Sequence, residues 1–366
     1  MQTQDVVKPS IYGLTFNELE DFFVKNGQKK SQAKRVWKAL YQEHIRNFAD
    51  MKSLDSECIQ FIEEHFTIQS IRTEICQKSK DGTVKFLYRL QDGNLIETVL
   101  MRQSYGTSVC VTTQVGCNIG CSFCASGLLR KNRDLTAGEI VEQIIHAQQY
   151  LNSENQGERI THAVVMGIGE PFDNYNNLVQ FLNIITSPRG LNLGPRHITV
   201  STSGIVPKIY DFAHLEPRVN LAISLHAPNN ELRTRMMKIN RAYPIDKLMA
   251  AVDYYIDKTN RRVTFEYIMI KDVNDGVEQA EELAELLKDM KKHAYVNLIP
   301  YNPVNEYSEY QRSPKESILK FYDVLKKNGI NCTIRQELGS DIDAACGQLR
   351  SKQIYIRNKK MVNRSV

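Results

Sequence analysis

The chain of 366 residues has 42% hydrophobic and 24% charged residues, the composition of a globular protein with room for one large domain and a smaller one. Collagen-like, mucin-like and wholly disordered chains are excluded, and no apolar run approaches the roughly 18 residues of a membrane-spanning helix. The N-terminus, from Met1 to Asp5, has no signal sequence, so we expect a cytoplasmic protein. The net charge of +5 permits a nucleic-acid partner without requiring one.

Helices are predicted first, within residues 11–67 of a small N-terminal domain that we place at residues 1–83. One helix starts near Leu14 and ends at Asn26-Gly27, and a second begins near Ser31 with Trp37 on its apolar stripe. Basic residues surround the second helix: Lys29, Lys30, Lys34, Arg35 and Lys38. A solvated surface is the commoner explanation of such a pattern, and a surface for RNA phosphates is the alternative.

A β-hairpin is predicted at residues 84–104, linking this domain to the rest of the chain. Two apolar runs, 84–90 and 95–101, flank a turn that contains Asp92-Gly93. In the second run Glu97 shares a face with Leu95, Val99 and Met101. Glu97 is either exposed at a sheet edge or a buried carboxylate, whose raised pKa would suit a base.

From residue 105 to about 340, short apolar strands alternate with amphipathic helices. The predicted strands are 108–113, 161–166, 197–202, 219–224, 263–270 and 294–299, with a final strand at 330–335. The predicted helices are 137–152, which a Thr136–Glu139 capping box opens, 174–186, 205–213, 245–258, 277–290 and 314–328. Six strand–helix units in series predict an α/β fold with a parallel, helix-covered sheet or partial barrel. A last segment, 341–366, ends in a basic tail.

Three of the eight cysteines stand close together as Cys117, Cys121 and Cys124. Structural zinc normally takes four protein ligands, often as two separated pairs, and no histidine follows this loop closely. Three thiolates on a 4Fe–4S cluster would leave one iron open to another ligand, which favours a cluster over zinc. An electron carrier is less favoured than a catalytic cluster, because carriers normally ligate every iron.

The spacing Cys-x3-Cys-x-aromatic-Cys, with Phe123 in the aromatic slot after the first strand of the series, resembles the radical S-adenosylmethionine (SAM) superfamily. The resemblance implies a partial (βα)6 radical-SAM barrel, one 4Fe–4S cluster held by the three cysteines, and SAM chelated on the open iron. Gly167-Ile168-Gly169-Glu170-Pro171 follows the second strand and resembles the segment that contacts the SAM amino group, so Gly169 and Glu170 are predicted cofactor contacts.

Further polar motifs follow later strands. Ser201 ends the third strand, Ser224-Leu225-His226 ends the fourth, and Asn302 follows the sixth, at the strand ends where barrel enzymes place their sites. Each motif alone would be an ordinary turn or cap. Together with Asp341 to Leu349 they resemble the RlmN family of dual-specificity RNA methyltransferases over nearly the whole chain.

This resemblance implies methylation of carbon 2 of adenine 2503 in 23S rRNA and of adenine 37 in a subset of tRNAs, which supports translational fidelity. Cys346 matches the methyl-carrying cysteine, Cys110 the second cysteine that resolves the RNA–protein thioether in a disulfide with Cys346, and Glu97 the proton acceptor. Two SAM molecules are consumed per turnover. We expect a monomer that receives its electron from a donor such as a flavodoxin system.

Two rival functions stay open at this point. A Cfr-type enzyme would methylate carbon 8 of the same rRNA adenine, but the proline of Gly169-Glu170-Pro171 favours the carbon-2 family. A non-catalytic RNA-binding protein with a metal cluster would explain the basic residues and the three-cysteine loop, yet it leaves Cys110 and Cys346 without a role. Candidate RNA contacts are Lys29, Lys30, Lys34, Arg35 and Lys38, with Arg130, Lys131 and Arg133 after the loop.

Overall fold

The computed structural model describes residues 8–128, 130–154, 157–304, 309–342 and 349. Three helices form the N-terminal region: α1 (Phe16–Lys25), α2 (Lys30–Tyr41) and α3 (Ser56–His65). The Thr15 hydroxyl accepts a hydrogen bond from Glu18 N, and the Glu18 carboxylate accepts one from Thr15 N, so a capping box starts α1. Trp37 of α2 lies edge-on against the ring of Phe16 and is buried, as its place on the apolar stripe predicts.

Ten strands form one sheet with the order β1-β2-β3-β4-β7-β8-β9-β10-β11-β12. The strands are β1 (Ile71–Lys78), β2 (Val84–Leu90), β3 (Leu95–Gln103), β4 (Gly106–Cys110), β7 (Ile160–Val165), β8 (Ile198–Thr202), β9 (Asn220–Ser224), β10 (Val263–Met269), β11 (Ala294–Pro300) and β12 (Asn331–Ile334). From β4 to β12 each neighbouring pair is parallel. The predicted series of parallel strands is therefore confirmed.

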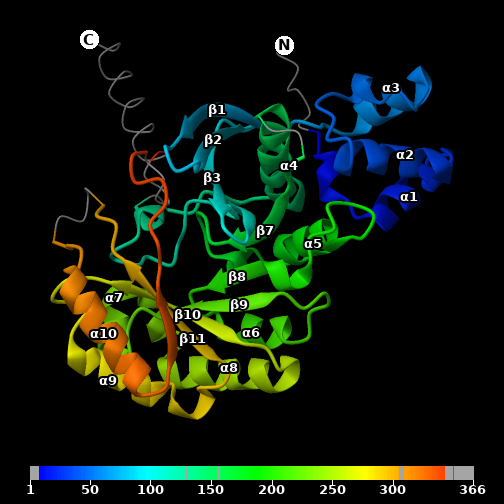
Figure 1. Cartoon of the computed structure of the whole chain (residues 1–366). Helices are drawn as coiled ribbons and strands as arrows, with labels where there is room; N and C mark the ends of the chain where they lie inside the picture. Colours follow the sequence, from blue (N-terminus) through cyan, green and yellow to red (C-terminus); the bar gives the residue numbers. More distant parts are fainter. Residues whose placement is uncertain (1–7, 129, 155–156, 305–308, 343–348, 350–366) are drawn as a thin grey trace, which may run out of the picture.

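Helices follow these strands and lie around the outside of the curved sheet, as Figure 1 shows. They are α4 (Ala137–Glu154), α5 (Tyr175–Thr186), α6 (Val206–Phe212), α8 (Ile245–Thr259), α9 (Val277–Leu286) and α10 (Lys315–Lys327). At the start of α4, Thr136 N donates a hydrogen bond to the Glu139 carboxylate and Glu139 N donates one to the Thr136 hydroxyl, so the capping box that the sequence predicts is present. A short helix that sequence reasoning missed, α7 (Asn230–Met236), packs against the cysteine loop through Leu232 and Met236.

The predicted hairpin is β2 and β3, and its turn places Gly93 at a φ of 83°. It is an integral part of the main sheet rather than a separate linker, because β3 pairs with β4 on one side and β2 pairs with β1 on the other. Sequence reasoning missed β1, in which Ile71, Thr73 and Ile75 alternate with charged residues. Both strands of the hairpin are almost fully buried as a result.

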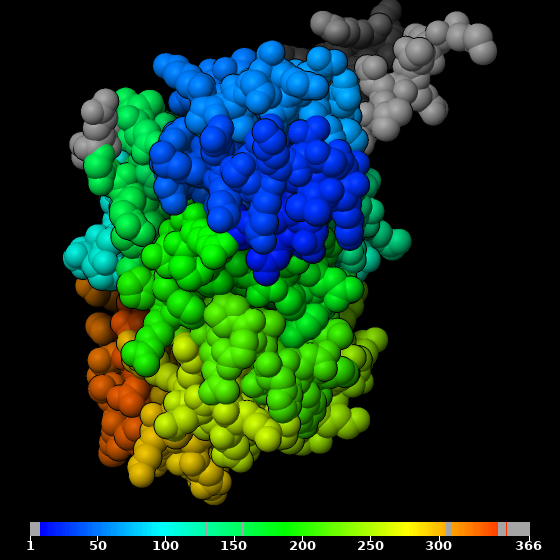
Figure 2. Space-filling model, turned by 90° about the vertical axis from the view of Figure 1, so that its right-hand side faces the viewer, coloured from blue at the N-terminus to red at the C-terminus, as the bar shows by residue number. Residues whose placement is uncertain are grey.

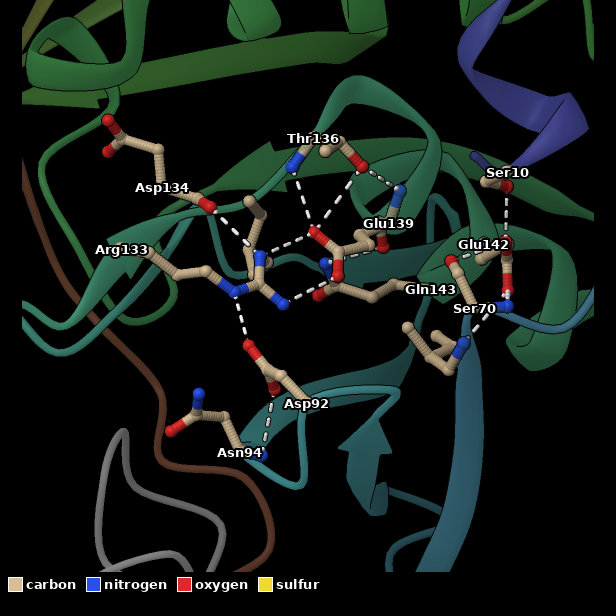
Figure 3. Close-up of polar contacts among 12 residues, drawn as sticks. Ser10, Ser70, Asp92, Asn94, Arg133, Asp134, Thr136, Glu139, Glu142 and Gln143 are labelled. Carbon is tan, nitrogen blue, oxygen red and sulfur yellow. Dashed lines mark hydrogen bonds and ion pairs between the residues drawn. The ribbon is translucent and has the colours of Figure 1, made fainter. Parts of the chain in front are cut away.

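The N-terminal helices cap the molecule beside α4 and α5, as Figure 2 shows. The indole of Trp37 donates a hydrogen bond to Arg189 O at 2.9 Å. A fully buried carboxylate on α4, Glu142, accepts hydrogen bonds from the hydroxyls of Ser10 and Ser70 and from the backbone N–H groups of Ser70 and Ile71 (Figure 3). Glu142 thus joins the residues on both sides of the N-terminal helices to the barrel.

Burial raises the pKa of Glu142 to about 7, although its hydrogen bonds act in the opposite direction. The folded protein therefore holds a proton there that the unfolded chain releases near pH 4.5, so this contribution to stability is complete below about pH 4.5 and is lost as the pH rises through 7. We expect Glu142→Gln to flatten the decline in unfolding free energy between these pH values. Denaturant titrations of both proteins across this range measure the effect, and parallel curves would contradict it.

No helix in the described part of the chain is long and apolar enough to cross a membrane.

Candidate active site

The motif residues meet at one edge of the sheet, where the parallel strands end. Glu170 follows β7, Ser201 and Thr202 end β8, Ser224 ends β9, and His226 comes two residues later. The hydroxyl groups of Ser201 and Ser224 lie 3.3 Å apart, which shows that neighbouring strands bring their C-terminal residues together. This is the edge at which α/β barrels hold their ligands.

The cysteine loop lies at this edge. Cys117, Cys121 and Cys124 are each partly exposed, and Cys121 and Cys124 contact an apolar cluster that contains Phe123 and residues of α7. Ser122 N donates to Met236 O at 2.9 Å, and the Ser122 hydroxyl lies 2.8 Å from the hydroxyl of Tyr310. The loop is therefore anchored on two sides.

The chemistry of these thiols fits a cluster. Burial raises the pKa of Cys117 to about 12, and burial together with the neighbouring Cys124 and Cys117 holds the pKa of Cys121 well above its usual value. Iron would reverse this preference, because it binds the thiolate form. Within the described residues no three His, Cys, Asp or Glu side chains are arranged to hold a single metal ion. A 4Fe–4S cluster binds each cysteine through a different iron.

Phe123, the aromatic residue of the loop, connects the cysteines to the end of β9. Its ring contacts the imidazole of His226 edge-on, with 5.0 Å between the centroids. Ile268 N donates a hydrogen bond to His226 Nδ1 at 3.1 Å, which places the imidazole proton on Nε2. Burial lowers the pKa of His226 to about 3, so the ring is neutral at physiological pH. His226 is thus a neutral donor held beside the cysteine loop.

The glycines before Glu170 are required by close packing against the chain after β4. A Cβ atom on Gly167 would lie 2.6 Å from Val111 O, and one on Gly169, whose φ is +111°, would lie 2.6 Å from Gln114 Cβ. The Glu170 carboxylate is used within the protein, because it accepts hydrogen bonds from the Thr202 hydroxyl and Ser203 N, both at 2.7 Å. Glu170 therefore ties β7 to β8.

Leu225 is buried, whereas Asn302 is exposed. The Leu225 side chain is fully buried in the main core, so only its backbone can face a ligand. Asn302 is exposed after β11. Between β9 and β11, the carboxylate of Glu266 on β10 is 5% exposed and accepts a hydrogen bond from Asn297 at 2.8 Å. Sequence reasoning missed this carboxylate, although its position within an apolar strand was a signal.

Arg233 on α7 is a second residue that sequence reasoning missed. Its guanidinium is fully buried and donates hydrogen bonds to Ser203 O at 2.6 Å, to Leu225 O at 3.2 Å and to Asn240 Oδ1 at 2.9 Å. Burial lowers its pKa to about 10, an effect that the nearby Cys121 opposes, so Arg233 is charged at neutral pH. It joins the loops after β8 and β9 and places a positive charge near the cysteine loop.

Glu97 and Cys110 line one small cavity together with Val99, Thr112 and Gly167. Val99 pairs with Cys110 across β3 and β4, and Glu97 lies two residues from Val99 on the same face. Glu97 is 4% exposed because β3 is an inner strand, so the edge-strand alternative is wrong. Its carboxylate forms an ion pair with Lys85 of β2, with 2.9 Å between Lys85 Nζ and Glu97 Oε2.

The backbone of Glu97 is held by a buried polar network. The Thr112 hydroxyl donates to Glu97 O at 2.6 Å and accepts from Ile168 N at 3.2 Å. Gln143 of α4 accepts from Thr112 N and donates to Thr112 O, at 2.8 and 2.9 Å. This network fixes the strand that carries Glu97 to the segment that follows Cys110, and sequence reasoning did not single out either Thr112 or Gln143.

Cys346 lies outside the described residues, as do Gly347 and the basic tail. The residues before and after that segment contact the face of the sheet that carries Glu97. Leu338 packs against a cluster that contains Cys110, and Leu349 packs against Leu87 and Leu95. Gly339 N donates to the carboxylate of Asp81 at 2.7 Å, in the turn between β1 and β2.

The predicted RNA-binding residues make many ion pairs within the protein. Arg133 forms ion pairs with the carboxylates of Glu139 and Asp92 (Figure 3). These ion pairs hold the segment that follows the cysteine loop against the start of α4 and against the turn between β2 and β3. Ion pairs also join Lys131 to Asp134 and Asp173, Lys30 to Glu20, and Lys38 to Glu43. Their part in RNA binding stays a prediction.

A larger cavity, of about 610 Å³, lies elsewhere. Thr199, Asn220 and Thr264 line it, at the N-terminal ends of β8, β9 and β10. The motif residues stand at the opposite ends of these strands, so this cavity is not part of the candidate site.

Comparison with known proteins agrees with the fold. Residues 111–287 match the radical SAM superfamily, and residues 10–68 match the ribosomal RNA large subunit methyltransferase N-terminal domain. A probable dual-specificity RNA methyltransferase RlmN of Shouchella clausii is 63% identical over 94% of this chain and 97% of its own length. The chain belongs to the RlmN family. As a member, it is a radical SAM RNA methyltransferase, a class that uses SAM and a 4Fe–4S cluster.

Two further comparisons agree with this assignment. The probable RlmN of Enterococcus faecalis is 62% identical over 95% of this chain and 97% of its own. A solved radical SAM methyltransferase from Sphaerobacter thermophilus is 41% identical, with a TM-score of 0.89, and covers 93% of this chain and 98% of its own. The predicted radical SAM barrel is thereby confirmed, and the alternative of a non-catalytic RNA-binding protein with a metal cluster is wrong.

Proposed function

We propose that this RlmN family enzyme methylates carbon 2 of adenine in 23S rRNA, at adenine 2503, and in a subset of tRNAs, at adenine 37. The observation that carries the proposal is the cavity shared by Glu97 and Cys110, with the residues on both sides of the Cys346 segment packed on the same face of the sheet. A base, a resolving thiol and the segment that carries the second, methyl-carrying thiol are what this methylation needs.

The cofactors supply the reactive radical. With Cys117, Cys121 and Cys124 as its ligands, a 4Fe–4S cluster would provide the electron that cleaves SAM to a 5′-deoxyadenosyl radical. The neutral imidazole of His226 and the backbone at Gly169 and Leu225 stand at the same sheet edge and would orient SAM there. A radical is required because carbon 2 of adenine is not nucleophilic and is a poor target for direct methyl transfer.

The cysteines and Glu97 would perform the remaining chemistry. Cys346 takes the methyl group from one SAM by displacement, which forms an S–CH3 bond and releases S-adenosylhomocysteine. The 5′-deoxyadenosyl radical would remove one hydrogen atom from this S–CH3 group, and the carbon would then bond to carbon 2. As the adenine ring regains its aromaticity, the oxidised cluster would take up the unpaired electron. Glu97 accepts the proton from carbon 2. The Cys110 thiolate attacks the Cys346 sulfur, so an S–S bond forms, the S–C bond to RNA breaks, and the carbon keeps the electron pair and is protonated to a methyl group.

Mass spectrometry of digested RNA tests the reaction directly. We expect the wild-type enzyme, with its cluster reconstituted and with SAM and a reductant, to form 2-methyladenosine in defined 23S rRNA and tRNA fragments. Cys346→Ala should form none. Formation of 8-methyladenosine would overturn the proposal in favour of the Cfr-type reaction, and the absence of any methylated adenosine would overturn it altogether.

Cys110→Ala provides a sharper test of the assigned roles. Because the thiol that would resolve the thioether is gone, we expect one turnover to leave RNA covalently attached to Cys346, with release of methylated RNA at least about a hundredfold slower. A denaturing gel and peptide mass spectrometry would detect the adduct. Cys332→Ser, which alters a buried thiol on the distant β12, is the control. Normal release by Cys110→Ala would contradict the assignment.

A further inference from the structure

Lys85 is a buried cation on an inner strand of the sheet. It lies on β2 and is fully inaccessible to solvent, and its ammonium group is 2.9 Å from Glu97 Oε2. In the register of β2 and β3, Lys85 pairs with Val99 and Leu87 pairs with Glu97. Lys85 and Glu97 are thus diagonal neighbours on one face of the sheet, the arrangement in which long side chains of opposite charge reach each other.

A buried ion pair of this kind has no evident purpose in stability. Transfer of two charges from water into the protein costs about as much as their attraction returns, so apolar side chains of similar size would serve the fold as well or better. Several neighbours of the pair on this face are apolar, with Leu87, Leu95, Val99 and Met101 all buried. The position of the pair, with Glu97 lining the same cavity as Cys110, suggests a chemical purpose instead.

The proposed role of Glu97 as a proton acceptor explains why a cation is needed beside it. A carboxylate can accept a proton only while it is ionised, and burial without a cation favours its neutral form. A cation in direct contact favours the ionised form and also fixes the direction of the carboxylate plane. Lys85 approaches from β2, whereas Cys110 reaches the cavity from β4 on the other side of β3. The cation therefore stands on the side of Glu97 away from the thiol.

We propose that Lys85 is the positioning residue for the carboxylate of Glu97, holding it ionised and oriented to take the proton from the substrate carbon. This inference rests on the proposed function. It confines the effect of Lys85 to one stage of the reaction: proton removal and release of RNA depend on it. Methyl transfer to Cys346 and cleavage of SAM do not.

The test follows each stage separately in single turnovers of the full-length enzyme with reconstituted cluster, SAM, reductant and an rRNA fragment. For Lys85→Met we expect 5′-deoxyadenosine formation and methylation of Cys346 within about twofold of wild type, with an unchanged affinity for RNA. Release of methylated RNA should fall by about tenfold or more, so that the covalent RNA adduct accumulates. Lys85→Arg should release RNA faster than Lys85→Met, because it keeps the charge, although its larger planar group fits a fully buried position less well.

A double-variant comparison shows whether Lys85 acts through Glu97. The pair of changes Lys85→Met and Glu97→Gln should release RNA no more slowly than Glu97→Gln alone, because Lys85 affects release through the Glu97 carboxylate. The double variant also avoids leaving a lone buried charge, so it stays folded even if Lys85→Met is destabilised. Arg102→Met, which removes a cation from β3 that pairs with Glu158, is the matched control and should release RNA normally.

Three results would overturn the inference while leaving the proposed function intact. These are normal RNA release by Lys85→Met, equal loss of SAM cleavage and release, and additive effects in the double variant. A wild-type enzyme that forms no 2-methyladenosine would instead overturn the proposed function. The two failures are therefore distinguishable in the same set of reactions.

Discussion

Replacement of Cys121 by serine should abolish SAM cleavage, with a loss of at least about a thousandfold, or ~4 kcal/mol of activation free energy. Cys121 is the middle cysteine of the loop, and the loop is held in place by Ser122 and by the contact of Phe123 with His226. A serine hydroxyl at this position would be a poor ligand for iron, which in these clusters binds thiolates. Iron and sulfide content, the EPR spectrum and 5′-deoxyadenosine formation measure the effect under anaerobic conditions.

Cys76→Ser is the matched control, since Cys76 is an exposed thiol on β1. It should retain the cluster and the rate of SAM cleavage. A Cys121→Ser enzyme with a normal iron content and normal SAM cleavage would show that the three-cysteine loop does not hold the cluster. A low iron content in both variants would show that cysteine replacement in general, rather than loss of a ligand, disturbs reconstitution.

Strand positions and strand-end motifs could be predicted because their signals are local. The apolar runs from β7 to β11 match the predicted strands to within about a residue or two at either end, and their C-terminal residues gather at one edge as parallel strands require. The first strand of the series was predicted at 108–113, but β4 ends at Cys110, and Thr112 and Thr113 are used in hydrogen bonds with Gln143 and Ile168 instead. A local run of apolar residues cannot show at which residue a strand stops forming hydrogen bonds with its neighbours in the sheet.

Contacts between side chains on different strands and helices could not be predicted from local sequence patterns. The environment of Glu97 depends on the pairing of β3 with both β2 and β4, and on Lys85, which reads in isolation as an exposed cation of a hairpin. The same holds for Glu142, whose four donors lie more than 70 residues away along the chain. Periodicity reports which face of an element is buried, but it does not identify what lies opposite.

Arg233 is the clearest case of such a residue, and its replacement is expected to affect both stability and cofactor binding. Arg233→Met would leave Ser203 O, Leu225 O and Asn240 Oδ1 without their donor. Each unsatisfied buried group costs about 1–3 kcal/mol, and part of this is offset because a buried charge is also removed. We therefore expect a loss of about 2–4 kcal/mol in unfolding free energy, measured by denaturant titration of the protein before reconstitution.

The cofactor effect separates Arg233 from a purely structural arginine. Because Ser203 and Leu225 stand at the sheet edge that would receive SAM, loosening their loops should weaken SAM binding by about tenfold in the reconstituted enzyme, measured by equilibrium dialysis. Arg235→Met on the same helix is the control, since Arg235 is exposed, and it should change neither quantity. Lower stability with unchanged SAM affinity would limit Arg233 to the fold. Three buried acceptors cannot lose their donor without a cost in stability. An unchanged free energy of unfolding would therefore contradict the stabilising role given to the hydrogen bonds of Arg233.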